Sequence, residues 1–274
     1  MAGEGLVVPE WIAEIGLNHN GSFELAKQMV ESAKASGATT VKFQTYEVEE
    51  RVSKDHPLYS VLSSCALSPE EFAGLKDFAE GIGLNFLTTV FGLTSLEIAA
   101  ELGLRRVKIA SFSIANLELI QAAISLGFTL VVSTGASHWS EILTCAARLQ
   151  ESNNRDHAFL HCISEYPVSS EGNLNLINIR HLASETGFQS GFSDHTSDSE
   201  AAFYAALAGA TVFEKHFTID RNLPGPDQRF SATPEIFRQS VINSERAWRI
   251  LGEPRETPFD SEQAILPFKV IKLD

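Results

Sequence analysis

The feature that most constrains the fold is an alternation of short apolar segments with segments of helical periodicity, which repeats eight times along the chain. Each apolar segment ends abruptly in polar residues, and each is followed by a stretch with apolar side chains every three or four residues. This alternation is typical of parallel strands joined by crossover helices. The predicted strands cover residues 11–16, 40–44, 85–89, 106–110, 129–133, 158–162, 188–192 and 211–215.

Eight strand–helix units in a chain of 274 residues predict a closed (β/α)₈ TIM barrel, in which the chemistry lies at the C-terminal ends of the strands. An open doubly wound sheet is the alternative, but it more often carries a Gly-rich phosphate loop after its first strand. Neither G-x-G-x-x-G nor G-x-x-x-x-G-K-[ST] occurs here. We predict one barrel domain over residues 1–274, because the segment after residue 252 is too short for a second domain.

Two helices have clear starting signals. Ser22 is a candidate N-cap, and Ser68 followed by Pro69 predicts an N-cap with proline in the first turn. The segment 46–66 is irregular, charged and interrupted by a proline, so we predict a long loop there.

Composition restricts the partners. The formal charge of −14 and the pI near 5.0 argue against binding nucleic acid or an anionic membrane. An anionic substrate would need a local cluster of lysines. No apolar run reaches the ~18 residues of a membrane span, and the N-terminus has no export signal. Three cysteines without a C-x-x-C pair favour a reducing compartment, so we predict a cytoplasmic protein.

Two histidines lie just past the apolar parts of the last two predicted strands. His195 follows the seventh strand and His216 follows the eighth. Because adjacent parallel strands end at the same edge, the two imidazoles are expected side by side, where they could hold one divalent metal. The alternative is that each histidine only caps its strand through a hydrogen bond.

Two lysines lie within predicted strands. Lys42 alternates with apolar neighbours and shares a face with Gln44, and Lys108 has the same setting in the fourth strand. A lysine inside a barrel is costly unless it meets an anion. Hydroxyl side chains at the strand ends complete a phosphate- or carboxylate-binding set; they are Thr89, Ser111, Ser133 and Ser193.

Other readings of these strand ends remain open. Lys108 could form a Schiff base, with Lys42 lowering its pKa, although that chemistry leaves the paired histidines unexplained. Glu14, followed by amides at residues 18–20, suggests polyol or metal chemistry, and the alternative there is a simple turn.

Eight motifs in order then carry a family resemblance: Ile-Ala-Glu-Ile-Gly-x-Asn-His-Asn-Gly, Val-Lys-Phe-Gln, Val-Lys-Ile-Ala-Ser, Ser-Thr-Gly, His-Cys-x-Ser-x-Tyr-Pro, Gly-x-Ser-Asp-His-Thr, Glu-Lys-His-Phe-Thr and Gly-Pro-Asp. Over about residues 10–250 the chain resembles the sialic acid synthase family, including its legionaminate, pseudaminate and spore-coat polysaccharide relatives.

The resemblance implies condensation of phosphoenolpyruvate with an open-chain N-acetylated hexose, with release of phosphate. A manganese or magnesium ion on His195 and His216 would polarise the sugar aldehyde. By motif position, the phosphoenolpyruvate site would comprise Lys42, Thr89, Lys108, Ser111, Ser133, Ser164, Tyr166 and Ser193. Glu14 and Asp227 would hold sugar hydroxyls, and Gln44 joins the substrate-binding set. The predicted catalytic residues are Glu14, Lys108, Ser113 and Tyr166.

The chain departs from the family pattern at three points. The family usually has Glu where Ser113 stands, and a hydroxyl is a poor base at pH 7. Ser113 would share a face with Ser111 if the strand continued that far; Glu14, Glu165 or metal-bound water could take over its role. Ser164 stands where some members carry Asn.

The third departure concerns a domain. The family usually appends an antifreeze-like domain that lends an Arg to the partner subunit's sugar site, and this chain stops at Asp274 without it. We expect a homodimer, with a separate antifreeze-like polypeptide as an alternative partner. A barrel or subunit that binds ligand without full synthase activity is the competing function.

Overall fold

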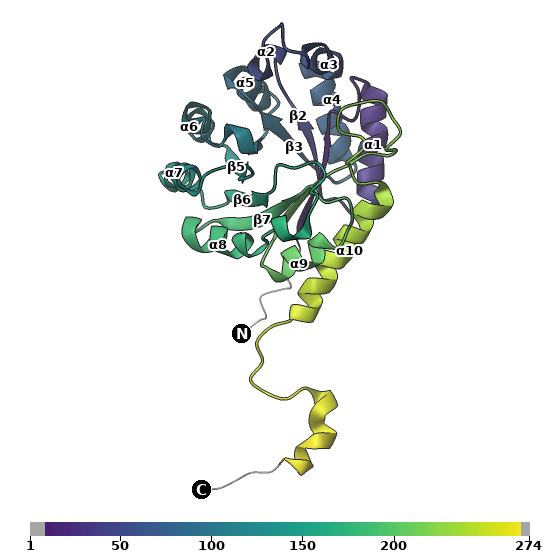
Figure 1. The fold of residues 1–274 in the computed structure, drawn as a ribbon, viewed down its shortest axis with the longest axis vertical. Coiled ribbons are helices and arrows are strands. Elements are labelled where there is room, and N and C mark those ends of the chain that lie inside the picture. Colours follow the sequence, from purple (N-terminus) through teal and green to yellow (C-terminus); the bar gives the residue numbers. More distant parts are fainter. Residues whose placement is uncertain (1–8, 270–274) are drawn as a thin grey trace.

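The computed structural model describes residues 9–269 and forms a closed barrel of eight parallel strands in sequence order, so the predicted (β/α)₈ fold is confirmed. Figure 1 shows the strands at the centre and the helices around them. The strands are β1 (Glu10–Gly16), β2 (Thr40–Gln44), β3 (Asn85–Val90), β4 (Arg106–Ile109), β5 (Thr129–Ser133), β6 (Ala158–Cys162), β7 (Gln189–Asp194) and β8 (Val212–His216).

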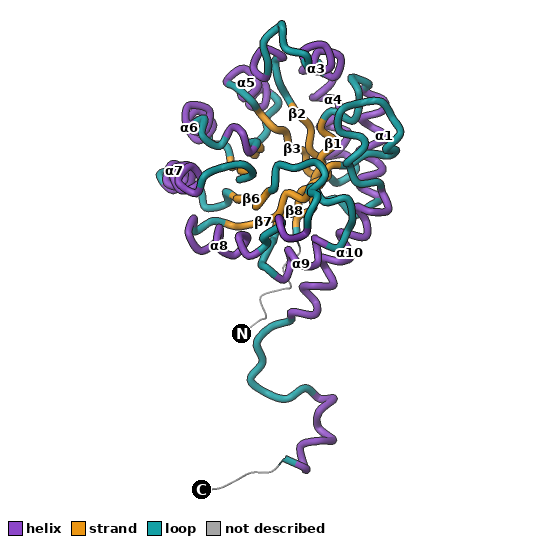
Figure 2. Tube along the Cα trace, viewed as in Figure 1, coloured by secondary structure: helices purple, strands orange, loops and turns teal. Residues whose placement is uncertain are grey.

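Eight helices cover the outside of the barrel, as the ring of helices around the strands in Figure 2 shows. Ser22 and Ser68 cap α1 and α4 as predicted, each accepting a hydrogen bond from a backbone N–H in the first turn. The covering helices are α1 (Phe23–Ala35), α4 (Pro69–Gly81), α5 (Leu93–Glu101), α6 (Leu117–Ser125), α7 (Trp139–Gln150), α8 (Ile177–Thr186), α9 (Ala201–Leu207) and α10 (Pro234–Leu251).

The prediction of an unstructured loop over residues 46–66 is wrong. The segment contains two short helices, α2 (Val48–Arg51) and α3 (Tyr59–Cys65). Val48, Leu62 and Cys65 are buried in a satellite cluster beneath this segment. Burial of these side chains stabilises the two short helices. The charged residues between the helices interrupt the helical spacing of apolar residues, so the sequence does not reveal them.

The interior of the barrel changes character along its axis. At the N-terminal end of the strands an apolar plug fills the barrel; its residues are Ile12, Leu87, Val131, Ala158, Leu160 and Val212. Since side chains two residues apart share a face, the next inward positions on these strands are Glu14, Thr89, Ser133, Cys162 and Glu214. The plug therefore supports a polar layer at the C-terminal ends of the strands.

Gly16 ends β1 with a bulge in its pairing to β2 and a φ of +55°. A Cβ atom there would lie 3.0 Å from Glu14 Oε1 and 3.1 Å from Gln44 Nε2. Glycine is therefore required both for the backbone conformation and for the space that this polar pair occupies.

After α10 the chain leaves the barrel as an exposed segment that contains the 3₁₀ helix η3 (Asp260–Phe268), which lies away from the barrel in Figure 1. Within residues 9–269, none of the helices combines the length and the apolar character that a bilayer crossing requires.

Candidate active site at the C-terminal ends of the strands

A cavity of about 440 Å³ opens at the C-terminal ends of the strands. All the predicted site residues except Ser113 line it; they are Glu14, Lys42, Gln44, Thr89, Lys108, Ser111, Ser133, Ser164, Tyr166, Ser193, His195, His216 and Asp227. Because the C-terminal ends of all eight strands meet at one end of the barrel, side chains that are more than 200 residues apart in the sequence line the same cavity.

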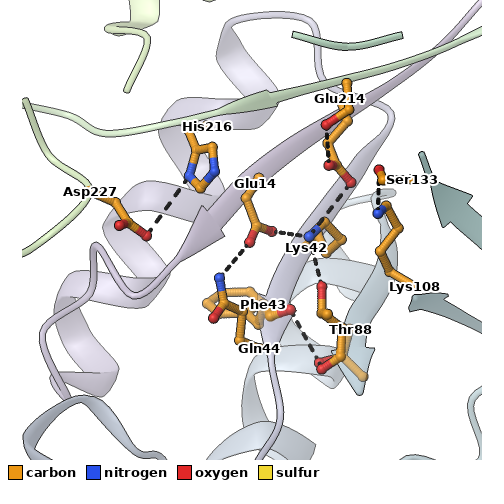
Figure 3. A network of polar contacts seen from close by, with 12 residues as sticks. Glu14, Lys42, Phe43, Gln44, Thr88, Lys108, Ser133, Glu214, His216 and Asp227 are labelled. Atoms are coloured by element: carbon orange, nitrogen blue, oxygen red, sulfur yellow. Dashed lines mark hydrogen bonds and ion pairs between the residues drawn. The ribbon is translucent and has the colours of Figure 1, made fainter. Parts of the chain in front are cut away.

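Lys42 lies at the centre of a buried ion-pair network (Figure 3). Its Nζ is 2.7 Å from Glu14 Oε2 and 3.5 Å from Glu214 Oε2, and it donates a hydrogen bond of 2.8 Å to Thr89 Oγ1. Burial alone would lower the pKa of Lys42, but the two carboxylates outweigh burial and raise it. Lys42 therefore remains an ammonium group.

Lys108 is buried with less support. Its Nζ donates to Ser133 Oγ at 2.6 Å and to the Ile109 carbonyl at 3.0 Å, and it forms no ion pair with any carboxylate among residues 9–269. Burial and the nearby Lys42 charge lower its pKa. A buried ammonium with only neutral partners is a suitable binding group for an anion.

The two carboxylates around Lys42 differ in acidity. Burial raises the pKa of Glu14, and the charge of Glu214 adds to this effect against the opposing effect of Lys42. Burial would also raise the pKa of Glu214, but Lys108 and Lys42 outweigh it and lower that pKa to about 2. Glu14 is therefore the carboxyl group of this pair that can more easily carry a proton.

Hydroxyl groups line the wall between the lysines and the histidines. Ser193 Oγ donates to Glu214 Oε1 at 2.9 Å, and Ser111 Oγ accepts from the Gly135 N–H at 3.0 Å. A Cβ atom on Gly135 would lie 2.3 Å from Ser164 Oγ, so glycine is needed there for the loop after β5 to approach Ser164.

The two histidines lie side by side, with ring centroids 5.7 Å apart. His195 Nδ1 is 2.7 Å from the Ile163 carbonyl oxygen, an arrangement that fixes the ring and leaves Nε2 for another partner. His216 Nδ1 is buried and has no hydrogen-bond partner among the described residues; Asp227 Oδ2 lies 4.0 Å away. Burial, with the His195 charge, holds the pKa of His216 well below its ordinary value, so this imidazole is neutral.

These histidines fit a divalent cation as two nitrogen ligands: His216 is already neutral, and His195, whose pKa the nearby Cys162 raises against burial, would give up its proton on binding the ion. No group of three or more His, Cys, Asp or Glu side chains in residues 9–269 has metal-binding geometry. An ion held here would therefore take its remaining ligands from substrate or water, as open catalytic sites do for at least one ligand.

An aromatic wall closes the histidine side of the cavity. The Tyr166 ring lies 4.1 Å from the His195 ring and 5.1 Å from that of Phe230, measured between centroids. Burial raises the pKa of Tyr166, so its phenol stays protonated and can act as a hydrogen-bond donor.

Ser113 does not share a face with Ser111, because β4 ends at Ile109 and residues 111–113 form the 3₁₀ turn η1. Ser113 is buried and is absent from the cavity lining. The turn instead places Phe112 at the cavity, with 75% of its surface exposed. Of the two carboxylates expected to take over its role, Glu14 lines the cavity and Glu165 does not.

Several cavity residues were given no role by the sequence. Glu214 lies two residues before His216 on the same strand, so strand alternation could have placed it inside the barrel. Phe91, Phe112 and Cys162 lie at or just beyond strand ends. Arg51 lies in the segment expected to be a loop, and Phe230 lies in the connection between β8 and α10.

Comparison with known proteins gives consistent matches. The sequence model of the NeuB family matches residues 29–256. N,N'-diacetyllegionaminic acid synthase from Legionella pneumophila is 35% identical over 272 residues, which cover 93% of this chain and 76% of that protein. An uncharacterized protein from Methanocaldococcus jannaschii is 38% identical, covering 93% of this chain and 75% of its own length.

The fold is also shared with a solved structure. The crystal structure of N-acetylneuraminic acid synthetase from Leptospira borgpetersenii, in complex with citrate, has a TM-score of 0.89 and 34% sequence identity. The match covers 95% of this chain and 90% of that one.

Proposed function

The chain belongs to the NeuB family, and we propose that it condenses phosphoenolpyruvate with the aldehyde of an open-chain N-acetylated hexose to give a nonulosonic acid and phosphate. The relatives of known function are nonulosonic acid synthases, which supports the product class. The choice of phosphoenolpyruvate as the second substrate rests on the chemistry of the cavity.

The observation that carries the proposal is the pair of buried lysines beside the two histidines. Lys108 forms no ion pair with a carboxylate in the described part of the chain, and Lys42 is paired with Glu14 and Glu214, so an incoming phosphate or carboxylate would meet two ammonium groups. Hydroxyls of Ser111 and Ser164 line the same cavity and can donate to the remaining oxygens, whereas the Ser193 hydroxyl donates to Glu214.

The proposed reaction forms one carbon–carbon bond and replaces the carbon–oxygen bond to phosphate with one to the oxygen of water. The enol methylene carbon attacks the aldehyde carbon, and the aldehyde oxygen takes up a proton. Water adds to the resulting oxocarbenium centre and loses a proton. The tetrahedral intermediate then expels phosphate while its new hydroxyl group gives up its proton, which leaves a ketone. The lysines and hydroxyls hold the phosphate and carboxylate through these steps, which is catalysis by positioning.

His195 and His216 would hold the divalent cation, manganese or magnesium, which supplies Lewis-acid polarisation of the aldehyde oxygen. The Tyr166 ring lies against the His195 ring, so the sugar would bind on the side of His195 that Tyr166 does not cover. Glu14 is assigned the proton transfer, since it lines the cavity and burial raises its pKa.

The test is phosphate release from phosphoenolpyruvate in the presence of manganese, across a panel of N-acetylated hexoses. We expect release with at least one sugar, and loss of release when manganese is removed by a chelator. A barrel that binds these ligands without turnover is the second candidate, favoured by Ser113 and its position outside the cavity lining. Phosphoenolpyruvate binding without phosphate release from any sugar would support that candidate.

A further inference from the structure

The outer part of the cavity is formed by a row of three side chains from separate elements. Arg51 ends α2, Phe91 follows β3, and Phe112 lies in η1. The Arg51 guanidinium carbon lies 4.4 Å from the Phe91 ring centroid, and the Phe91 and Phe112 rings stack with centroids 5.9 Å apart and planes 18° apart. All three line the cavity.

Arg51 is held in place but has unused donors. Its Nη1 donates to Gln44 Oε1 at 2.8 Å, and its guanidinium carbon lies 4.9 Å from the Tyr46 ring centroid. A guanidinium carries five N–H donors. Arg51 forms no ion pair with a carboxylate in the part of the chain that the structure describes. Oriented by Gln44 and the rings, it is prepared to bind an oxygen acceptor in the cavity.

The charged groups around the cavity indicate whether the oxygen acceptor for Arg51 is anionic or neutral. The lysine and arginine side chains of the lining are Lys42, Arg51 and Lys108, and three carboxyl groups share the lining with them; these are Glu14, Glu214 and Asp227. The proposed phosphoenolpyruvate occupies the two lysines. A second phosphate at Arg51 would therefore find only one cation, whereas a neutral carbonyl needs no more than the donors that Arg51 offers.

The exposed Phe112 ring adds an apolar surface beside these donors. A group with a carbonyl oxygen and a methyl group side by side would satisfy both features, because the oxygen would accept from Arg51 and the methyl would cover the aromatic ring. Resting on the proposed function, we propose that Arg51, Phe91 and Phe112 form the subsite for the N-acyl group of the acceptor sugar.

The test compares two acceptors, the best N-acetylated hexose of the panel and its counterpart with a hydroxyl in place of the acetamido group. In Arg51→Met, kcat/KM for the acetamido sugar should fall by about 10- to 100-fold, the usual effect of losing a hydrogen bond to a charged group. The value for the hydroxyl sugar and the affinity for phosphoenolpyruvate should stay within about two-fold, since neither ligand would use this subsite.

Further variants separate the parts of the subsite. Phe112→Ala removes an exposed ring at little risk to folding and should raise KM for the acetamido sugar alone. Arg51→Lys keeps the charge without the planar fork and should restore only part of the activity. Arg105→Met is the matched control, because Arg105 is exposed just before β4, at the opposite end of the barrel.

Two results would overturn the subsite: equal losses for both sugars in Arg51→Met, or loss of phosphoenolpyruvate affinity by the same factor. If no sugar supports phosphate release, the proposed function fails, and ligand-observed NMR of the same two sugars then tests the subsite separately. Equal affinity of the wild type for both sugars, or binding of neither, would contradict it.

Discussion

The buried charged groups on the two faces of β7 and β8 differ in how completely the protein itself supplies their partners. On the outer face, Lys215 Nζ lies 2.7 Å from Asp194 Oδ2 and 2.8 Å from the Thr196 carbonyl oxygen, with Thr196 Oγ1 at 3.3 Å. On the inner face, the same strands present Ser193, Glu214 and the two histidines to the cavity. On the outer face the charged groups are paired within the protein, whereas on the inner face polar groups line a cavity that a ligand can enter.

Lys108, on the inner face of β4, makes the contrast sharper. It is as deeply buried as Lys215, with 2% of its surface exposed in each case, but among residues 9–269 it donates only to a serine hydroxyl and a backbone carbonyl. A buried charge that is fully paired serves the fold, because removing its partner leaves an uncompensated charge. A buried charge that lacks its counter-ion is a cost to the fold that a ligand can offset.

The largest effect is expected on the outer face. Lys215→Met leaves the Asp194 carboxylate buried without its partner, so the free energy of unfolding should fall by about 3–5 kcal/mol. Urea unfolding followed by circular dichroism measures this loss. The double variant Asp194→Leu/Lys215→Met removes both charges and should recover most of the stability. If Lys215→Met is as stable as the wild type, the outer pair does not have the structural role assigned to it.

The next effect concerns the inner face. Lys108→Met keeps the bulk of the side chain and removes its charge, so the free energy of unfolding should stay unchanged or rise. Phosphoenolpyruvate affinity should fall by about 100-fold, a typical loss for a charged hydrogen bond in a buried site. Calorimetry measures the affinity, and denaturation measures the stability of the same sample. A loss of stability comparable to that of Lys215→Met, with affinity retained, would reverse the comparison.

Strand alternation explains why much of this arrangement could be predicted. The bounds of β2, β5 and β6 agree with the predicted segments, and inside these regular strands the inward position of Lys42 and Ser133 follows from the period of two. His195 and His216 were placed by the same reasoning, since His195 follows β7, His216 ends β8, and the ends of these adjacent strands meet at one edge. The barrel and the inner polar layer are therefore local consequences of sequence pattern.

The residues that could not be predicted lie where the pattern stops. Arg51 lies on a four-residue helix and packs against the nearby Tyr46 and against Phe91, which is 40 residues further along the chain; no local periodicity reveals the second contact. Ser113 was placed on the assumption that β4 continued, but the strand ends at Ile109 and a 3₁₀ turn follows. Tertiary packing decides both positions.

The smallest effect on activity is expected from a substitution at Ser113. This residue lies beyond the end of β4, so it belongs to neither the inner nor the outer face of the barrel. If a carboxylate at this position reached the reacting carbon, Ser113→Glu would raise the rate of phosphate release, since a positioned acid or base contributes about 10²–10⁴-fold. Because Ser113 is buried in the turn and does not line the cavity, we expect a change of less than about two-fold, far below that acid–base contribution.

Phosphate release with the best sugar of the panel measures this change in rate. Ser111→Ala is the companion variant, because Ser111 lies in the same turn and lines the cavity, so a loss of rate is expected there. A gain of about ten-fold or more in Ser113→Glu would show that the turn can bring this side chain to the substrate, and that the inner face extends beyond the end of β4.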